Sequence, residues 1–243
     1  MLEKYLKIRK EKNSVLCIGL DPREKKENLL PFCLNIIEKT SEFACAYKPN
    51  LQFLLPLSFE EMGKLTSAIH KANALAILDS KLSDIGSSNE AGMNWAKEMG
   101  FDAITYSPFS GNIEEMGKIS SKYNMGIFAL TLMSNPESKF FMRENSIEGK
   151  KGYEWIAGQI KKHNIGGSVV GATHITEQEI QKIRSLIGED KIILFPGIGA
   201  QGGDLEKIFK YGGSNILINV ARDIIYSSNP REKAEEYYNK MKR

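Results

Sequence analysis

The chain has 243 residues, of which 42% are hydrophobic, and its 33 basic and 30 acidic side chains leave a net charge of +3. This length and composition predict a folded protein and argue against disorder, because ordinary apolar content can bury a core. No apolar run approaches the roughly 18 residues of a membrane span, and the charged N-terminus lacks a secretory signal. We therefore expect a cytoplasmic protein that binds neither membranes nor nucleic acid, since its basic runs are interleaved with acidic or apolar residues.

The cysteines and histidines predict neither a disulfide framework nor a metal site. Cys17, Cys33 and Cys45 are odd in number and form no C-x-x-C pair, which favours a reducing compartment. The three histidines lack metal-ligand spacing such as H-E-x-x-H. We expect no bound metal.

Short β-branched runs alternate along the chain with longer stretches of helical period. Several runs are apolar almost throughout, as strands buried on both faces must be. We predict eight strands, at 14–20, 43–48, 74–79, 102–106, 126–132, 167–172, 191–195 and 215–220. Their spacing is typical of βα units. The sequence therefore predicts an α/β protein with a single (β/α)8 TIM barrel over residues 1–243, and an open doubly wound sheet is the alternative.

Two capping patterns predict where helices begin. Thr176 and Glu179 form a capping box, and Gly188 follows the helix as a stop signal. Ser87 and Glu90 form a similar pattern, which predicts that Ser87 caps a helix.

Charged residues gather where predicted strands end, which is where (β/α)8 barrels place their working residues. They lie in the strings GLDPR, YKPN, DSKLSDIG and VARD. Lys48, Asp79, Lys81 and Asp84 are the most informative set, because charges at the ends of buried strands are unfavourable unless paired or functional. Alternation along a strand puts Asp79 and Lys81 on one side, within reach of Lys48. We favour a functional charge array over a structural ion-pair network.

The glycines of PGIGAQGG (196–203) predict a phosphate site. They match the G-x-G-x-x-G dinucleotide pattern, but too little chain follows for the rest of such a domain. We favour a phosphate cradle of backbone N–H groups after the seventh strand, with Arg222 gripping the same phosphate. Plain helix-capping glycines and a surface arginine are the alternative.

The polar segment 135–150 has no clear period and is either a lid or a disordered surface excursion. Ser134, just before it, either binds a polar ligand edge or serves as a turn residue. Ser88 is free to face the site.

Together these strings resemble the orotidine 5'-monophosphate decarboxylase family, from about Asp21 to Arg222. The D-x-K-x-x-D-I-G string at 79–86 is the strongest element, although D-x-K-x-x-D alone marks a wider suprafamily. The resemblance implies a barrel that needs no cofactor, works as a homodimer with shared active sites, and decarboxylates orotidine 5'-monophosphate to UMP for pyrimidine synthesis.

The resemblance also implies a role for each matching residue. Lys48, Asp79, Lys81 and Asp84 would form the catalytic array, with Lys81 as the proton donor. The substrate-binding residues would be Asp21, Asn50, Ile85, Ser88, Ser134, Pro196, Gln201, Ala221 and Arg222.

Within that set, each part of the nucleotide has its own implied partners. Asp21 and Lys48 would hold the ribose hydroxyls, and Ser134 would bind the pyrimidine edge. The phosphate would bind to Gln201, to the backbone at Ala221 and to Arg222. Asp84, Ile85 and Ser88 would enter the partner subunit's site.

Two positions depart modestly from the family pattern. Ala221 stands where Gly often precedes the arginine, and Ser88 stands where Thr is common. Ala221 keeps its backbone N–H, and Ser88 keeps a hydroxyl.

Three other functions are compatible with these residues. A Mg²⁺-dependent decarboxylase or aldolase for 3-keto sugar phosphates belongs to the same suprafamily, but we would expect its second strand to end in Glu rather than Lys48. A Schiff-base aldolase would also use a barrel lysine. A barrel that only binds a phosphate ligand is the alternative without catalysis.

Overall fold

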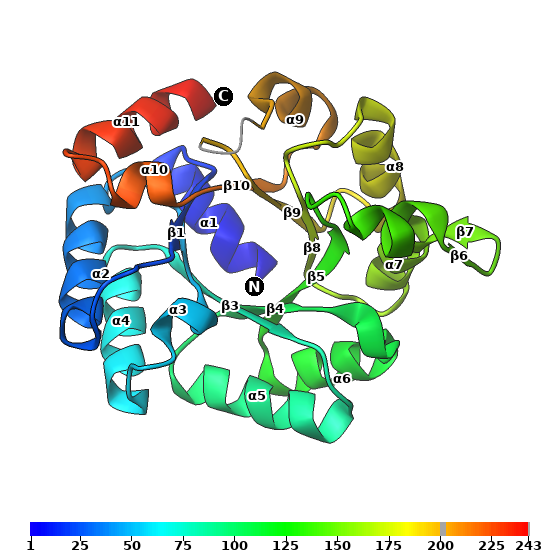
Figure 1. Cartoon of the computed structure of the whole chain (residues 1–243), viewed down its shortest axis with the longest axis horizontal. Helices are drawn as coiled ribbons and strands as arrows, with labels where there is room; N and C mark the ends of the chain where they lie inside the picture. Colours follow the sequence, from blue (N-terminus) through cyan, green and yellow to red (C-terminus); the bar gives the residue numbers. More distant parts are fainter. Residues whose placement is uncertain (200–202, 243) are drawn as a thin grey trace.

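The computed structural model describes residues 1–199 and 203–242. Within these ranges eight parallel strands close into a barrel in the order β1, β10, β9, β8, β5, β4, β3, β2 (Figure 1). The barrel strands are β1 (Leu16–Leu20), β2 (Ala46–Pro49), β3 (Leu75–Leu82), β4 (Ala103–Tyr106), β5 (Gly126–Leu132), β8 (Gly167–Val170), β9 (Ile192–Pro196) and β10 (Ile216–Val220). The closed order confirms the predicted (β/α)8 barrel and excludes the open sheet.

The predicted strands overlap all eight barrel strands and differ from them mainly at their ends. The bounds of β5 are those predicted, whereas β2 begins at Ala46 rather than at 43. β3 continues to Leu82 instead of ending at 79, and its pairing with β4 shifts register between Leu78 and Leu82. This irregular end of β3 positions the charged residues described below.

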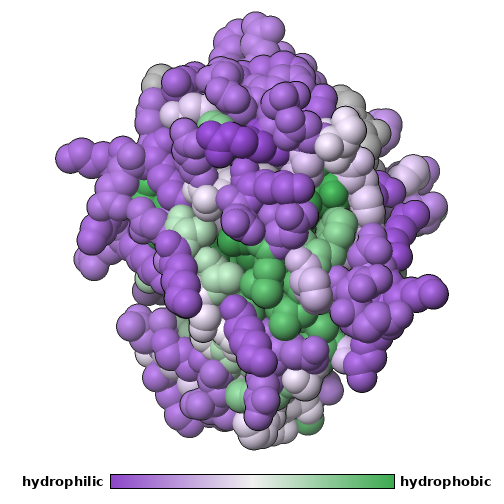
Figure 2. All heavy atoms as spheres, turned by 90° about the vertical axis from the view of Figure 1, so that its left-hand side faces the viewer, coloured by the Kyte–Doolittle hydropathy of each residue, from purple (hydrophilic) through white to green (hydrophobic). Residues whose placement is uncertain are grey.

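Helices surround the barrel (Figure 1). They are α1 (Leu2–Lys12), α2 (Lys26–Thr40), α3 (Leu51–Leu54), α4 (Phe59–Lys71), α5 (Gly86–Glu98), α6 (Ile113–Tyr123), α7 (Gly152–Lys162), α8 (Glu177–Ile187), α9 (Leu205–Tyr211), α10 (Arg222–Ile225) and α11 (Pro230–Met241). The side that carries α2, α4 and α11 is largely hydrophilic, with apolar residues visible near its centre (Figure 2). Among the described residues, no helix is long and apolar enough to cross a membrane.

One of the two predicted capping boxes is present. The Thr176 hydroxyl accepts a hydrogen bond from the Glu179 backbone N–H, and the Glu179 carboxylate accepts one from that of Thr176. The prediction for Ser87 is wrong: α5 begins at Gly86, before Ser87, and Glu90 instead pairs with Lys122 on α6. The Glu90 side chain, which the capping-box pattern requires at the helix start, is engaged in a tertiary ion pair instead.

The segment 135–150 has regular structure of its own, which excludes the disordered excursion. It contains a π-helical turn, η2 (Phe140–Glu144), and a hairpin of β6 (Ser146–Ile147) and β7 (Lys150–Lys151). A short 3₁₀ turn, η1 (Pro108–Ser110), follows β4.

Helix α1 covers the N-terminal end of the barrel and lies across its centre in Figure 1. The Tyr5 hydroxyl donates to the Ile216 carbonyl at 2.6 Å, where β10 begins. The Lys12 ammonium donates to three carbonyl oxygens that precede β2 and β3, those of Ser41, Ala44 and Ala72. With this end covered, the opposite end is available for a site.

Candidate active site

A cavity of about 240 Å³ opens at the C-terminal ends of the barrel strands. The predicted site residues that line it are Asp21, Lys48, Asn50, Asp79, Lys81, Ser134, Pro196, Ala221 and Arg222. They come from strand ends and from the loops that follow them, far apart in the sequence, and the closed barrel brings them together.

Asp79 is the centre of the charge array. Its Oδ1 accepts hydrogen bonds from Lys81 Nζ at 2.6 Å and from Thr105 Oγ1 at 2.9 Å, while its Oδ2 pairs with Lys48 Nζ. The side chains of Lys48 and Asp79 are 7% and 9% exposed, whereas that of Lys81 is 37% exposed. Lys81 is therefore the member of the array that a ligand can reach most readily.

Lys48 and Asp79 keep their charges although both are buried. Burial opposes the charge on Lys48, but the nearby carboxylates of Asp79 and Asp21 outweigh it and raise the Lys48 pKa. Burial likewise opposes the charge on Asp79, but Lys48 and Lys81 hold its pKa below the usual range. Lys48 and Asp79 are thus both ionised at neutral pH.

Lys81 reaches Asp79 from an irregular strand end rather than by simple alternation. Its backbone has a φ of +51°, in the left-handed region, and lies within the register shift of β3. The Lys81 N–H donates to Thr105 Oγ1 at 2.9 Å, and the Ser80 hydroxyl donates to the Thr105 carbonyl at 3.2 Å. Thr105 therefore supports both the carboxylate and the backbone of the array.

Asp21 has a polar atom that the described residues leave unsatisfied. Its Oδ1 is buried and has no hydrogen-bond partner among them. A buried acceptor without a donor is unfavourable. A ligand with hydroxyl groups in the cavity would supply the missing donor.

Glycines shape the part of the cavity after β9 and β10. Gly197 and Gly199 have φ values of +103° and +94°, which residues with side chains rarely adopt. A Cβ on Gly19 of β1 would lie 2.7 Å from that of Ala221, so glycine at 19 makes room for alanine at 221. The predicted ligand residue Gln201 lies outside the described residues.

Three predicted residues do not line this cavity. Asp84, Ile85 and Ser88 lie at the start of α5 and are exposed, Ile85 to 66%. The backbone at Asp84 is nonetheless held in place: its N–H donates to Asn89 Oδ1, and its carbonyl accepts from the amides of Asn89 and Asn112. The turn at Asp84 is therefore firmly held, and the exposed Asp84 side chain accepts a hydrogen bond at Oδ1 from the Ile85 N–H at 2.7 Å.

Sequence reasoning missed several lining residues, notably Thr105 and Asn219. Both are polar residues within otherwise apolar strands, and that contrast could have identified them. The other lining residues not predicted for ligand contact are Leu130, Met133, Val169, Leu194, Ile198 and Asp223, whereas Gly197 belongs to the predicted phosphate cradle. Among the described residues, no group of three His, Cys, Asp or Glu side chains could hold a metal ion.

The fold and this cavity define a (β/α)8-barrel enzyme with a lysine–aspartate–lysine array, centred on a buried aspartate, at the C-terminal ends of its strands. Residues 14–237 match the model of the orotidine 5'-phosphate decarboxylase / HUMPS family. The chain belongs to this family.

Sequence identity to individual relatives and structural similarity to a solved structure support the family match. Orotidine 5'-phosphate decarboxylase from Thermomicrobium roseum is 35% identical, covering 93% of this chain and 86% of its own. The protein of the same name from Cupriavidus metallidurans is 33% identical, covering 91% and 88%. The solved structure of Leishmania donovani OMP decarboxylase has a TM-score of 0.84 at 28% identity and covers 98% of both chains.

Proposed function

We propose that this chain is a carboxy-lyase that converts orotidine 5'-monophosphate to UMP in pyrimidine synthesis. The family match and the names of its curated relatives support this reaction. The observation that carries the proposal is the buried Asp79 carboxylate between two ammonium groups, on a cavity that also presents Arg222.

The reaction needs such an array because it creates a carbanion. Loss of CO2 breaks the bond between pyrimidine C6 and the carboxylate carbon and leaves the electron pair on C6. A fixed ammonium group stabilises this charge as it develops. We assign Lys81 to that role and to proton transfer to C6, because it is the accessible lysine of the array. Lys81 then regains its proton from solvent.

Asp79 and Lys48 support this step. Asp79 holds the Lys81 ammonium at 2.6 Å, and Lys48 keeps Asp79 ionised. The negative charge of Asp79 beside the substrate carboxylate disfavours the bound ground state more than the transition state, from which that charge departs as CO2.

We assign the rest of the cavity to the remaining parts of the nucleotide. We assign the ribose hydroxyls to Lys48 and to Asp21, whose Oδ1 lacks a donor among the described residues. We assign the pyrimidine edge to Ser134, while Asn50 and Pro196 line the wall.

We assign the phosphate to the end of the cavity formed after β9 and β10. Arg222 offers a bidentate guanidinium and Ala221 a backbone N–H, beside the loop that begins at Gly197. Gln201 is assigned to the phosphate from its motif alone. Binding energy from the phosphate, far from C6, can orient the base for reaction.

We also propose a homodimer with shared active sites. Asp84, Ile85 and Ser88 lie outside their own cavity, and the firmly held turn at Asp84 is suited to placing a carboxylate in a neighbour's site. A partner subunit that covered the 66% exposed side chain of Ile85 would remove apolar surface from water.

We further infer that residues 1–243 form one domain that works in the cytoplasm. The buried Tyr5 of α1 and the buried Tyr237 of α11 both pack into the barrel's apolar clusters, which supports a single unit. Three free cysteines agree with a reducing compartment.

An absorbance assay tests the reaction. Purified protein should consume orotidine 5'-monophosphate with release of CO2, at the same rate with and without EDTA. Tight nucleotide binding without CO2 release would contradict the enzyme and favour a binding protein. Loss of activity in EDTA would instead favour a Mg²⁺-dependent reaction, and borohydride trapping of substrate on a lysine would favour a Schiff-base aldolase.

A further inference from the structure

The segment between β5 and α7 is packed tightly against the barrel. Gly152, which begins α7, has no room for a side chain, because a Cβ there would lie 2.1 Å from the Phe141 carbonyl oxygen. Gly171, which follows β8, is equally restricted, since its Cβ would lie 2.7 Å from that of Ser134. The position of Ser134 therefore depends on the position of this segment relative to β8.

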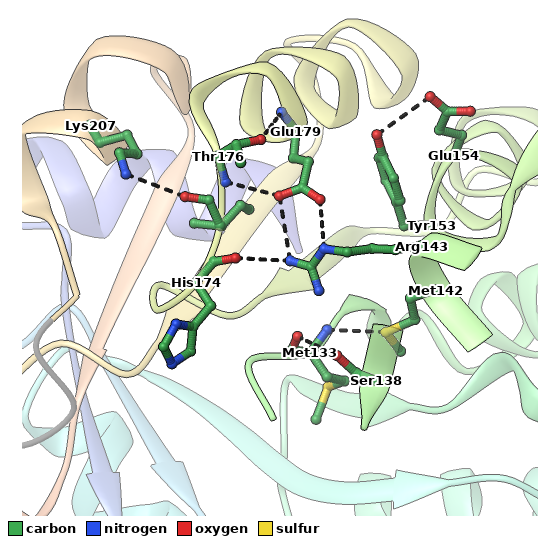
Figure 3. Close-up of polar contacts among 11 residues, drawn as sticks. Met133, Ser138, Met142, Arg143, Tyr153, Glu154, His174, Thr176, Glu179 and Lys207 are labelled. Carbon is green, nitrogen blue, oxygen red and sulfur yellow. Dashed lines mark hydrogen bonds and ion pairs between the residues drawn. The ribbon is translucent and has the colours of Figure 1, made fainter. Parts of the chain in front are cut away.

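The segment holds the residue before Ser134 by both of its backbone polar groups. The Met133 N–H donates to the Met142 sulfur at 3.1 Å, and the Ser138 hydroxyl donates to the Met133 carbonyl at 2.9 Å (Figure 3). Met142 belongs to η2, so a displacement of η2 would displace the Met133–Ser134 peptide.

Arg143, next to Met142, ties η2 to the loop after β8. Its Nε donates to Glu179 Oε1 at 2.7 Å, and its Nη2 donates to the His174 carbonyl at 3.1 Å (Figure 3). The side chains of Arg143 and Glu179 are 24% and 12% exposed, which limits screening by solvent.

Glu179 is held independently of Arg143. It is the capping-box residue of α8, and its Oε2 accepts from the Thr176 N–H at 2.9 Å. Lys207 of α9 donates to the Ile175 carbonyl in the same loop at 3.3 Å, which links the loop to the helix after the phosphate-side glycines (Figure 3). Arg143 thus joins the segment that carries Ser134 to the loop and helix that follow β8.

We propose that Arg143 is a positioning residue for the pyrimidine end of the site, acting through Met142 and Met133 on Ser134. The inference rests on the proposed function and deepens it, because it names what orients the residue assigned to the base. Arg143 itself does not line the cavity. Its loss should weaken the hold on substrate without removing the proton donor.

The test is a double-mutant cycle with Arg143→Gln and Ser134→Ala, assayed with orotidine 5'-monophosphate. Arg143→Gln alone should raise KM more than it lowers kcat and reduce kcat/KM by up to about a hundredfold, the order expected for a misplaced contact. In the Ser134→Ala background the same change should alter kcat/KM by no more than about twofold, because the residue it positions is absent.

Two further variants complete the test. Arg143→Lys should recover part of the lost kcat/KM, because an ammonium can still pair with Glu179. Lys139→Gln is the matched control on the same segment: Lys139 is 53% exposed and lies 3.9 Å from Glu144, so wild-type kinetics are expected. Should Arg143→Gln not fold, Glu179→Gln replaces it in the cycle.

The outcomes separate this inference from the function it rests on. Absence of decarboxylation by the wild-type protein would overturn the proposed function. With an active wild type, unchanged kinetics for Arg143→Gln would overturn the positioning role even if the melting temperature fell. If Arg143→Gln reduced kcat/KM equally in the wild-type and Ser134→Ala backgrounds, the positioning role would also be overturned, because Arg143 would then not act through Ser134.

Discussion

Lys81 has a backbone conformation that side chains disfavour. A residue with a Cβ in the left-handed region costs about 1–2 kcal/mol relative to ordinary conformations. Here the Lys81 N–H bonds to Thr105 and its ammonium bonds to Asp79, and these contacts hold the residue in place. Strain of this kind, overcome by surrounding structure, is typical of functional positions.

We predict that Lys81→Ala abolishes turnover while the protein still folds. Loss of a fixed charge at the reacting atom should remove at least about 3 kcal/mol of transition-state stabilisation. Alanine adopts the left-handed region no more easily than lysine, so it neither relieves nor adds strain there. Steady-state kinetics and circular dichroism check the two parts, with the exposed Lys118→Ala as control. Near-normal activity would exclude Lys81 as the proton donor.

At the scale of single elements, Arg184 of α8 holds several helix and strand ends together. Its guanidinium donates to the carbonyls of Gly188, Lys191, Gly212 and Asn215. Two of these carbonyls lie between α8 and β9 and two between α9 and β10, so one buried side chain satisfies acceptors from two connections. No local sequence pattern marks this residue, because its partners are distant in the chain.

Arg184→Met should lower the free energy of unfolding by about 3 kcal/mol, because buried carbonyls lose their donors. Urea unfolding measures the change, and Lys182→Met, at an exposed position of the same helix, should leave stability near wild type. Arg184 does not line the cavity, so kcat should be retained at low temperature. A stability loss below about 1 kcal/mol would show that water replaces the guanidinium.

At the scale of the whole molecule, the three cysteines lie in the barrel's two apolar clusters, so their reactivity measures how well those clusters exclude solvent. Cys17 and Cys45 lie in the cluster inside the barrel, and Cys33 lies in the layer between barrel and helices. Burial raises the pKa of Cys33 and of Cys45 to about 12 and also raises that of Cys17. The reactive thiolate is therefore suppressed in the folded state.

We predict that iodoacetamide at pH 9 alkylates none of the three cysteines in the folded protein and all three in urea, as mass spectrometry can show. The raised pKa values also set the sign of a stability change. Burial of the thiols contributes fully to the free energy of unfolding below pH 9, the ordinary thiol pKa. This contribution is lost as pH rises towards 12, because the thiols ionise in the unfolded state before they ionise in the folded state. Rapid labelling of the folded protein would mean that the clusters open readily.

The proposed shared site makes a prediction about the assembly. Asp84→Ala and Arg222→Ala chains should each be nearly inactive alone. Random pairing of the two should restore roughly a quarter of wild-type activity, since half the dimers are hybrids and each hybrid has one intact site. Co-expression with two affinity tags isolates the hybrid for assay. Recovery of no activity at all would contradict the assignment of Asp84 to a partner's site.

The sequence alone was sufficient for the barrel and for about half of the residues that line the cavity. Apolar runs bounded by turn residues mark buried strands, so β5 was placed at its observed bounds. The C-terminal ends of parallel strands meet on one side of a barrel. Lys48, Asp79 and Arg222 could therefore be assigned to one cavity from chain order alone.

Only the tertiary structure decided which neighbour each polar group meets. The register shift in β3, the support from Thr105 and the tie between Arg143 and Glu179 all join residues far apart in the chain. The same kind of contact pairs Glu90 with Lys122, and the expected cap at Ser87 is absent because α5 begins at Gly86. Local periodicity records which face of an element is buried, whereas pairing across elements depends on distances that exist only once the chain has folded.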